Sequence, residues 1–498
     1  MESNRVKIEQ EARFDQVKTT ELCEEYLKVV QKILPGRIMR WGLDCQVPFV
    51  TLNKSVITSS INKLYELKNK LLAIHEDSID FQMLIKSINY RLFEMDVLSE
   101  WQTRPYFYIE RQLNFFVDIF QSELSKSFSK EWFDARIKSI PDLCFTAIEN
   151  LDWQRVPSIE RIWGSIKLKR ISQMLEEVLV NRGESEKFIQ SILKPLQEFR
   201  NRLEDKTVLH PIIKPWNLNQ LERVIDDISG IKIDSEFLRE KCLKIISDTK
   251  VIASQIRTKK NGIKVEKAWI KKKLQDISIA FASLFDISNM LLGSLKISLI
   301  NDLNDEDINK PRASYAIVNT LTNEPSFYFF CRPSSYSNQS QLILDLVHEV
   351  YPGHHYERTL YYSSNKNNLC RLSYENIFFI EGWAKYVQDQ YLLLNFDEEM
   401  NLWNKRDHFV MALKALAVLC VHKQNADWSS SMSYLSNLTD LPSEIIASIL
   451  LEAYLNPIDT LAPLVGILAI QKYSEVNGID NNLIKTGGSD LWGVLVNQ

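Results

Sequence analysis

VHEVYPGHHYE, residues 347–357, begins like a metal-binding helix and then departs from the usual pattern. In an H-E-x-x-H helix the two histidines lie one turn apart and bind one metal, while the glutamate acts as a base. Here Pro352 occupies the position of the second histidine. Proline cannot donate a backbone hydrogen bond and clashes with the preceding turn, so we expect a kink or bulge there, with Gly353 letting the backbone adapt.

Two histidines follow the interruption, and helix geometry leaves both open as the partner of His348. At 100° per residue His355 returns to the face of His348, but in a straight helix it lies roughly 10 Å further along the axis. A bulge of about two residues would instead bring His354 into the place of the usual second ligand. The sequence therefore predicts a pair made of His348 and either His354 or His355.

A second acidic motif supplies the third ligand. Glu381 lies near the start of IEGWAKYVQDQYL (380–392), an amphipathic helical pattern about thirty residues downstream. Two neutral imidazoles and one carboxylate are the ligand set of catalytic zinc sites that keep a position open for water. We therefore predict a Zn²⁺ site, with Fe and Mn as alternatives because this ligand set does not identify the metal.

Composition places the chain among ordinary globular proteins. Of 498 residues, 45% are apolar and 25% charged, and the net charge of −4 argues against a nucleic-acid partner. The N-terminal residues 1–16 are charged throughout, and the longest apolar run, Leu461 to Ile470, is about half the roughly 20 residues of a membrane span. Seven scattered cysteines suggest reduced thiols, so we expect a cytoplasmic protein without membrane attachment.

Apolar residues recur at three- and four-residue steps over long segments, which predicts a mainly α protein. Residues 204–219 contain two prolines and interrupt this pattern, so we expect one compact unit of two halves, 1–210 and 211–498, with a cleft between them. Residues 314–320 and 326–330 read as two short strands beside the metal helix. Such a hairpin either offers an edge to an extended peptide or merely covers the core.

Together, VHEVYPGHHYE and IEGWAKY resemble the metallopeptidase-like family catalogued as domain of unknown function 885, whose hallmark is H-E-x-x-P-G-H followed by E-G-x-A. The histidine right after Pro-Gly is the steadier one in that family, so the resemblance implies His354 as the ligand and His355 as the alternate. It also implies a large helical metallopeptidase-like fold with a central cleft. Residues 419–435 are similar to a family segment in which a histidine precedes Trp-Ser, which would place His422 near that cleft.

The chain also departs from the family pattern. Val418 stands where relatives tend to have Asp four residues before the later histidine. Residues 457–460 read PIDT, and Pro463 follows, where relatives tend to read P-G-Q-A-x-x-Y. The resemblance therefore implies a retained metal centre with an altered substrate-recognition region.

These residues favour a zinc-dependent hydrolase of peptide or small-molecule amide bonds. Glu349 would act as general base on the metal-activated water, and His422 or Tyr386 could stabilise the oxyanion. For His422, a buried histidine bonded to a backbone carbonyl is the simpler interpretation.

The first alternative function is non-proteolytic metal chemistry on a specialised small molecule, including that of a non-haem iron oxygenase. The second is a non-catalytic helical binding protein. Substrate, exo or endo action and oligomeric state are not encoded in recognisable motifs.

Overall fold

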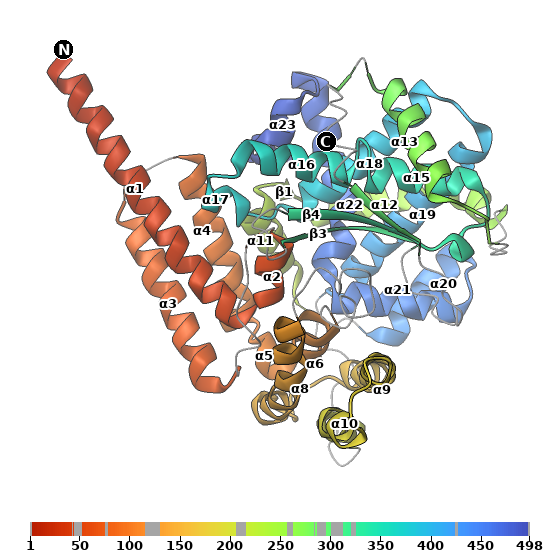
Figure 1. Ribbon diagram of the computed structural model, residues 1–498. Helices are drawn as coiled ribbons and strands as arrows, with labels where there is room; N and C mark the ends of the chain where they lie inside the picture. The colour runs from red at the N-terminus through yellow and green to blue at the C-terminus, as the bar shows by residue number, and fades with distance from the viewer. Residues whose placement is uncertain are drawn as a thin grey trace. The chain divides into compact units, whose positions relative to one another are not determined.

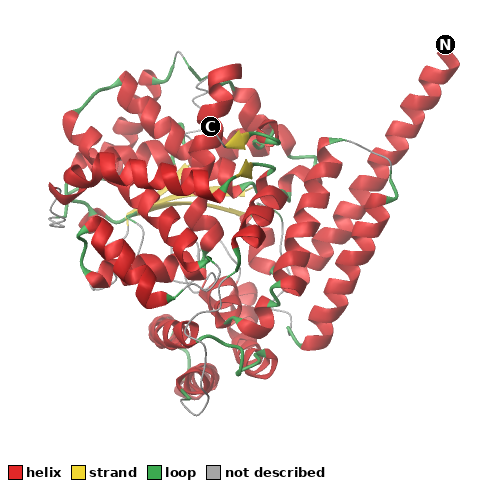
Figure 2. Cartoon of the chain, turned by 180° about the vertical axis from the view of Figure 1, so that it is seen from behind, coloured by secondary structure: helices red, strands yellow, loops and turns green. Residues whose placement is uncertain are grey.

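A computed structural model gives the fold and confirms the prediction of a mainly α protein (Figure 2). It describes residues 2–41, 43, 52–74, 78–114, 130–205, 216–255, 262–282, 284–285, 295–299, 312–319, 325–423 and 427–496. The chain folds into two compact units. Unit 1 comprises Met1–Lys214, Val318–Pro325 and Asn367–Tyr374, and unit 2 comprises Pro215–Ile317, Ser326–Lys366 and Glu375–Gln498. The predicted boundary between residues 210 and 211 lies outside the described residues.

Unit 1 is built mainly from helices in its described part, to which the end of β3 (residues 318–319) and the first residue of β4 (Pro325) add a few strand residues. The α-helices α1, α3 and α4 pack on one another, and α10 packs on both α8 and α9 (Figure 1). The elements are α1 (Glu2–Ile33), α2 (Pro35–Arg40), α3 (Lys54–Leu72), α4 (Ile79–Leu92), the π-helix η1 (Phe93–Val97), α5 (Glu100–Thr103), α6 (Pro105–Tyr108), the π-helix η2 (Ile109–Asn114), α8 (Lys130–Asn150), α9 (Ser158–Asn181), α10 (Glu186–Glu204) and α17 (Leu369–Leu372).

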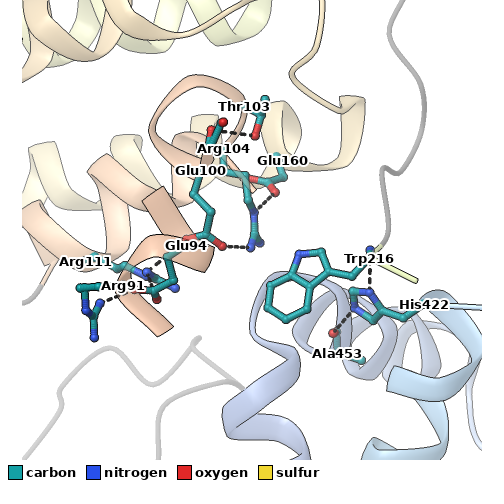
Figure 3. Close-up of polar contacts among 11 residues, drawn as sticks. Arg91, Glu94, Glu100, Thr103, Arg104, Arg111, Glu160, Trp216, His422 and Ala453 are labelled. Atoms are coloured by element: carbon teal, nitrogen blue, oxygen red, sulfur yellow. Dashed lines mark hydrogen bonds and ion pairs between the residues drawn. The ribbon is translucent and has the colours of Figure 1, made fainter. Parts of the chain in front are cut away.

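A chain of alternating charges runs through the interior of unit 1 (Figure 3). In order, its members are Arg91, Glu94, Arg111, Glu100, Arg104 and Glu160. Arg104 holds both neighbours, with Nη1 2.9 Å from Glu100 Oε1 and Nε 2.6 Å from Glu160 Oε1. The three carboxylates are at most 2% exposed. Because each buried charge faces an opposite one, the network satisfies groups that would otherwise destabilise the fold.

Unit 2 contains the remaining helices and most of the strand residues of the two sheets. Its helical elements are α11 (Leu218–Ser229), α12 (Ser235–Gln255), α13 (Lys267–Ala280), η4 (Pro333–Ser335), α15 (Gln339–Glu349), α16 (His354–Asn365), α18 (Ile377–Leu394), α19 (Glu398–Val421), α20 (Trp428–Thr439), α21 (Ser443–Leu455), α22 (Pro457–Asn477), α23 (Asn481–Lys485) and η5 (Ser489–Leu491). The strands are β1 (Lys232–Ile233), β2 (Leu295–Leu299), β3 (Ala313–Asn319), β4 (Pro325–Cys331) and β5 (Leu495–Val496).

The predicted strand pair is present as β3 and β4, and it belongs to a three-stranded sheet of order β2-β4-β3 (Figure 1). The strand β2 was not predicted; it pairs in parallel with β4, with Leu295 opposite Phe327 and Leu299 opposite Cys331. Among the strands that the structure describes, β3 pairs with β4 alone and so lies at an edge of this sheet. A two-stranded parallel sheet joins β1 to β5.

Helix ends in unit 2 follow local signals in the sequence. Asn338 caps α15 by accepting a hydrogen bond from the Gln341 N–H, and Asn376 caps α18 in the same way through Phe379.

None of the described helices is, by itself, both long and apolar enough to cross a membrane. The helices α21 and α22, bent by 93° at their junction, meet that test of length and composition as a pair.

Candidate metal centre

The predicted interruption of the metal helix is present. α15 ends at Glu349 and α16 begins at His354, and the peptide bond between Tyr351 and Pro352 is cis. The Gly353 N–H donates to the Val347 carbonyl at 3.0 Å, so the backbone folds back on the end of α15. A Cβ on Gly353 would lie 1.7 Å from the His348 carbonyl oxygen, so only glycine fits here.

Aromatic side chains hold the segment between α15 and α16 against α18. Trp383 of α18 is fully buried, and its Nε1–H donates to the Pro352 carbonyl at 2.8 Å. Phe285 packs edge-on against the Trp383 ring at 5.6 Å and lies 5.9 Å from the ring of Tyr356, which follows the interruption. Because Trp383 lies two residues after Glu381, this bond sets the position of the carboxylate relative to the histidines.

A close helix crossing positions Glu381 from the other side. α18 and α22 approach at Gly382 and Gly466, where an added Cβ would meet backbone atoms at 2.3 Å and 1.9 Å respectively. Small residues at both positions therefore allow the two backbones to touch. Gly382 directly follows Glu381, so this crossing fixes the start of the helix that carries the third ligand.

Three side chains converge on one point. His354 Nε2 lies 3.6 Å from Glu381 Oε1, and His348 Nε2 lies 3.8 Å from Glu381 Oε2. One ligand atom from each of the three residues lies within 4.8 Å of the other two. Tetrahedral zinc, with bonds of about 2.0–2.2 Å, places its ligand atoms about 3.4 Å apart. The donor set suits zinc, and the two distances between an imidazole nitrogen and the carboxylate lie within a few tenths of an ångström of this spacing.

Burial favours the neutral form of each of these three groups. It lowers the pKa of His348 well below its usual range, and the positive charge of Lys385 lowers it further. Burial, followed by the charge of Arg358, lowers the pKa of His354 to about 3. Burial and the negative charge of Asp459 raise the pKa of Glu381 to about 7. Both imidazoles are therefore unprotonated at neutral pH, as metal ligation requires.

Glu349 lies at the end of α15, next to the cluster. Burial raises the pKa of its carboxyl to about 8, and the negative charges of Asp345 and Glu381 act in the same direction. A backbone hydrogen bond from Tyr315 of β3 opposes this shift and holds the carboxyl at the sheet edge. An arginine clamp supports this arrangement, because Arg312, just before β3, donates two hydrogen bonds of 3.1 Å to Asp345.

The structure distinguishes the two histidines that the sequence left open. His354 lies in the cluster, whereas the fully buried His355 packs between Tyr315 and Phe327, at ring distances of 5.6 Å and 5.3 Å. The Nδ1 atom of His355 lies 3.3 Å from the Thr359 hydroxyl oxygen. His355 therefore takes part in packing α16 against the sheet.

The two residues suggested as oxyanion stabilisers have other partners. The Trp216 backbone N–H donates to His422 Nδ1 at 3.0 Å, and His422 Nε2 lies 3.3 Å from the Ala453 carbonyl oxygen (Figure 3). These contacts assign the single N–H of the neutral ring to that carbonyl, which favours the structural interpretation of His422. Tyr386 has a side-chain hydrogen bond with Ser474. Both side chains are therefore engaged in packing contacts of their own.

Several residues that shape the site had no recognisable signal. Tyr315 contributes a backbone group, and Trp383 and Gly466 act through contacts between segments far apart in sequence. Lys385 could have been found, because it follows Glu381 by four residues and so lies on the same helix face.

Comparisons with known proteins add the fold alone. No protein-family model and no curated protein matches the sequence. A candidate lipoprotein of unknown function from Shewanella oneidensis is similar in structure, with a TM-score of 0.67 and 12% identity over 95% of this chain and 98% of that chain. A candidate lipoprotein from Colwellia psychrerythraea gives a TM-score of 0.66 and 13% identity over 96% and 97% of the two chains. The resemblance to domain of unknown function 885 and the cytoplasmic location stay predictions.

Proposed function

We propose that this protein is a metal-dependent hydrolase of peptide or amide bonds, with zinc as the metal. The observation that carries the proposal is the convergence of His348 Nε2, His354 Nε2 and the Glu381 carboxylate, with the Glu349 carboxyl beside them. Three ligands from the described part of the chain leave a fourth position for water, which is the arrangement of catalytic rather than structural zinc sites. No cysteine belongs to the cluster.

The residues divide the work between holding the metal and moving a proton. A zinc ion held by His348, His354 and Glu381 would lower the pKa of a bound water to about 7 and polarise a carbonyl group. Glu349, beside this position, would accept a proton from that water and deliver it to the leaving nitrogen.

The position of β3 supports a peptide as substrate. β3 is an edge strand, and Tyr315 on it is bonded to Glu349. An extended chain that added its backbone to this edge would carry an amide bond past the general base. The alternative chemistry of a non-haem iron oxygenase uses the same three donors but does not need Glu349 as a proton carrier. A non-catalytic binding protein needs neither Glu349 nor the open metal position.

Removal of the metal tests the proposal. We expect chelation followed by dialysis to reduce hydrolysis of a peptide library at least a hundredfold, because the activated water is lost, and we expect one equivalent of Zn²⁺ to restore it. Mass spectrometry of the products identifies the bonds cleaved. Hydrolysis that persists after the metal is removed would show that the cluster is not the catalytic centre. Oxidised products that depend on Fe²⁺ and oxygen would favour the oxygenase.

A further inference from the structure

Lys385 places its ammonium group near the cluster of His348, His354 and Glu381. It follows Glu381 by one helical turn on α18, so the two side chains share one face of the helix. The Lys385 side chain is only 16% exposed. Its positive charge lowers the pKa of each of the four site residues, namely His348, Glu349, His354 and Glu381.

The ammonium group uses little of its bonding capacity. Lys385 Nζ donates one hydrogen bond to Gln388 Oε1 at 2.9 Å, and the nearest carboxylate oxygen is Asp407 Oδ2 at 3.9 Å. An ammonium has three donors, so two are unused within the described part of the chain. Arg312 and Arg358 also act on the cluster, but each is held by two hydrogen bonds to a carboxylate.

Lys385 and a metal held by the cluster would together attract an anionic ligand. Both would present positive charge to a group bound in this poorly hydrated site. A carboxylate bound between them would be attracted to both and would accept the unused hydrogen bonds. We infer that Lys385 forms an anion subsite that binds a substrate carboxylate next to the scissile amide bond. This inference rests on the proposed function and adds the class of substrate.

A pair of metal-directed ligands tests the subsite through binding. The probes are a peptidyl hydroxamate with a terminal carboxylate and its carboxamide analogue, titrated by calorimetry into the zinc-loaded protein. We expect the carboxylate to bind about tenfold more tightly, as a charge-assisted hydrogen bond implies. In Lys385→Met this ratio should fall to near one, whereas Lys385→Arg should keep most of it. Lys414→Met is the matched control. Lys414, on α19, already pairs with Glu452 of α21 at 2.7 Å, and it does not belong to the cluster.

The outcomes separate the subsite from the proposed function. An equal affinity for the two ligands, an unchanged ratio in Lys385→Met, or no binding of either ligand would overturn the inference. A tenfold ratio that depends on Lys385, in a protein that cleaves no peptide, would retain the subsite and reject the hydrolase. A third ligand, with a terminal amide and an aspartyl side chain, identifies the source of the carboxylate. Its tighter binding would assign an acidic side chain in place of the chain terminus.

Discussion

Glu349→Gln should abolish hydrolysis and leave the metal in place. Glutamine keeps the size of the side chain but cannot accept the proton of the attacking water, so we expect turnover to fall by about 10²–10⁴-fold. The metal content should be unchanged, because His348, His354 and Glu381 still converge at 3.6–3.8 Å. Initial rates on the best substrate, together with elemental analysis of the same preparation, check both parts.

Asp345→Asn provides the matched control for that experiment. Asp345 lies one turn before Glu349 on α15 and is held by Arg312 and by the Tyr336 hydroxyl, which donates at 2.9 Å. It does not belong to the cluster, so its replacement should reduce the rate less than the replacement of Glu349 does. If Glu349→Gln retained full activity with the metal bound, Glu349 would not be the general base.

Arg104→Met should destabilise unit 1 more than any surface substitution in it. The change leaves Glu100 and Glu160 buried without their shared arginine. Breaking a buried ion network from one side costs about 3–5 kcal/mol in unfolding free energy, because the remaining charge is uncompensated. The partner carboxylates would then have to take up protons or draw in water.

Urea unfolding followed by circular dichroism measures the effect of Arg104→Met. Lys63→Met is the control, since Lys63 forms pairs on the surface of the same unit, with Glu25 at 2.7 Å and Glu66 at 3.0 Å. Its unfolding midpoint should change far less, because exposed pairs contribute little. Equal effects of the two substitutions would show that the network adds no more than surface pairs do.

The burial of Glu94 shows why the whole network matters. Burial by itself would raise the pKa of this carboxyl, but the charges of Arg91 and Arg111 outweigh it and lower the pKa to about 2. Glu94 therefore stays ionised while fully buried. The ion pairs form between residues of α4, η1, η2, α5 and α9, which tertiary folding brings together. No local pattern in the sequence predicts these pairs.

The fold was predictable wherever local patterns decide it. Apolar spacing predicted a mainly α protein, and β-branched and aromatic runs located β3 and β4 within one residue of each observed end. The strand β2 was missed because LKISL, residues 295–299, is short and becomes a strand through parallel pairing with the distant β4. Register with a remote partner cannot be read from five residues alone.

The cluster of His348, His354 and Glu381 was also predictable in part. His348, Pro352 and Glu381 carry local signals, because their spacing and chemistry imply ligands and a broken helix. The choice of His354 over His355 came from the family resemblance, and the structure supports it by packing His355 against Tyr315. The supports from Tyr315 and Trp383 depend on segments brought together by folding, so no local pattern reveals them.

The metal content of two matched variants tests the central claim most directly. His354→Gln and His355→Gln change neighbouring histidines to the same residue, and elemental analysis of zinc-loaded, dialysed protein gives the number of ions per chain. We expect one zinc per chain in the wild type and in His355→Gln, and close to none in His354→Gln. A wild type that retains no zinc, or a loss confined to His355→Gln, would contradict a centre formed by His348, His354 and Glu381.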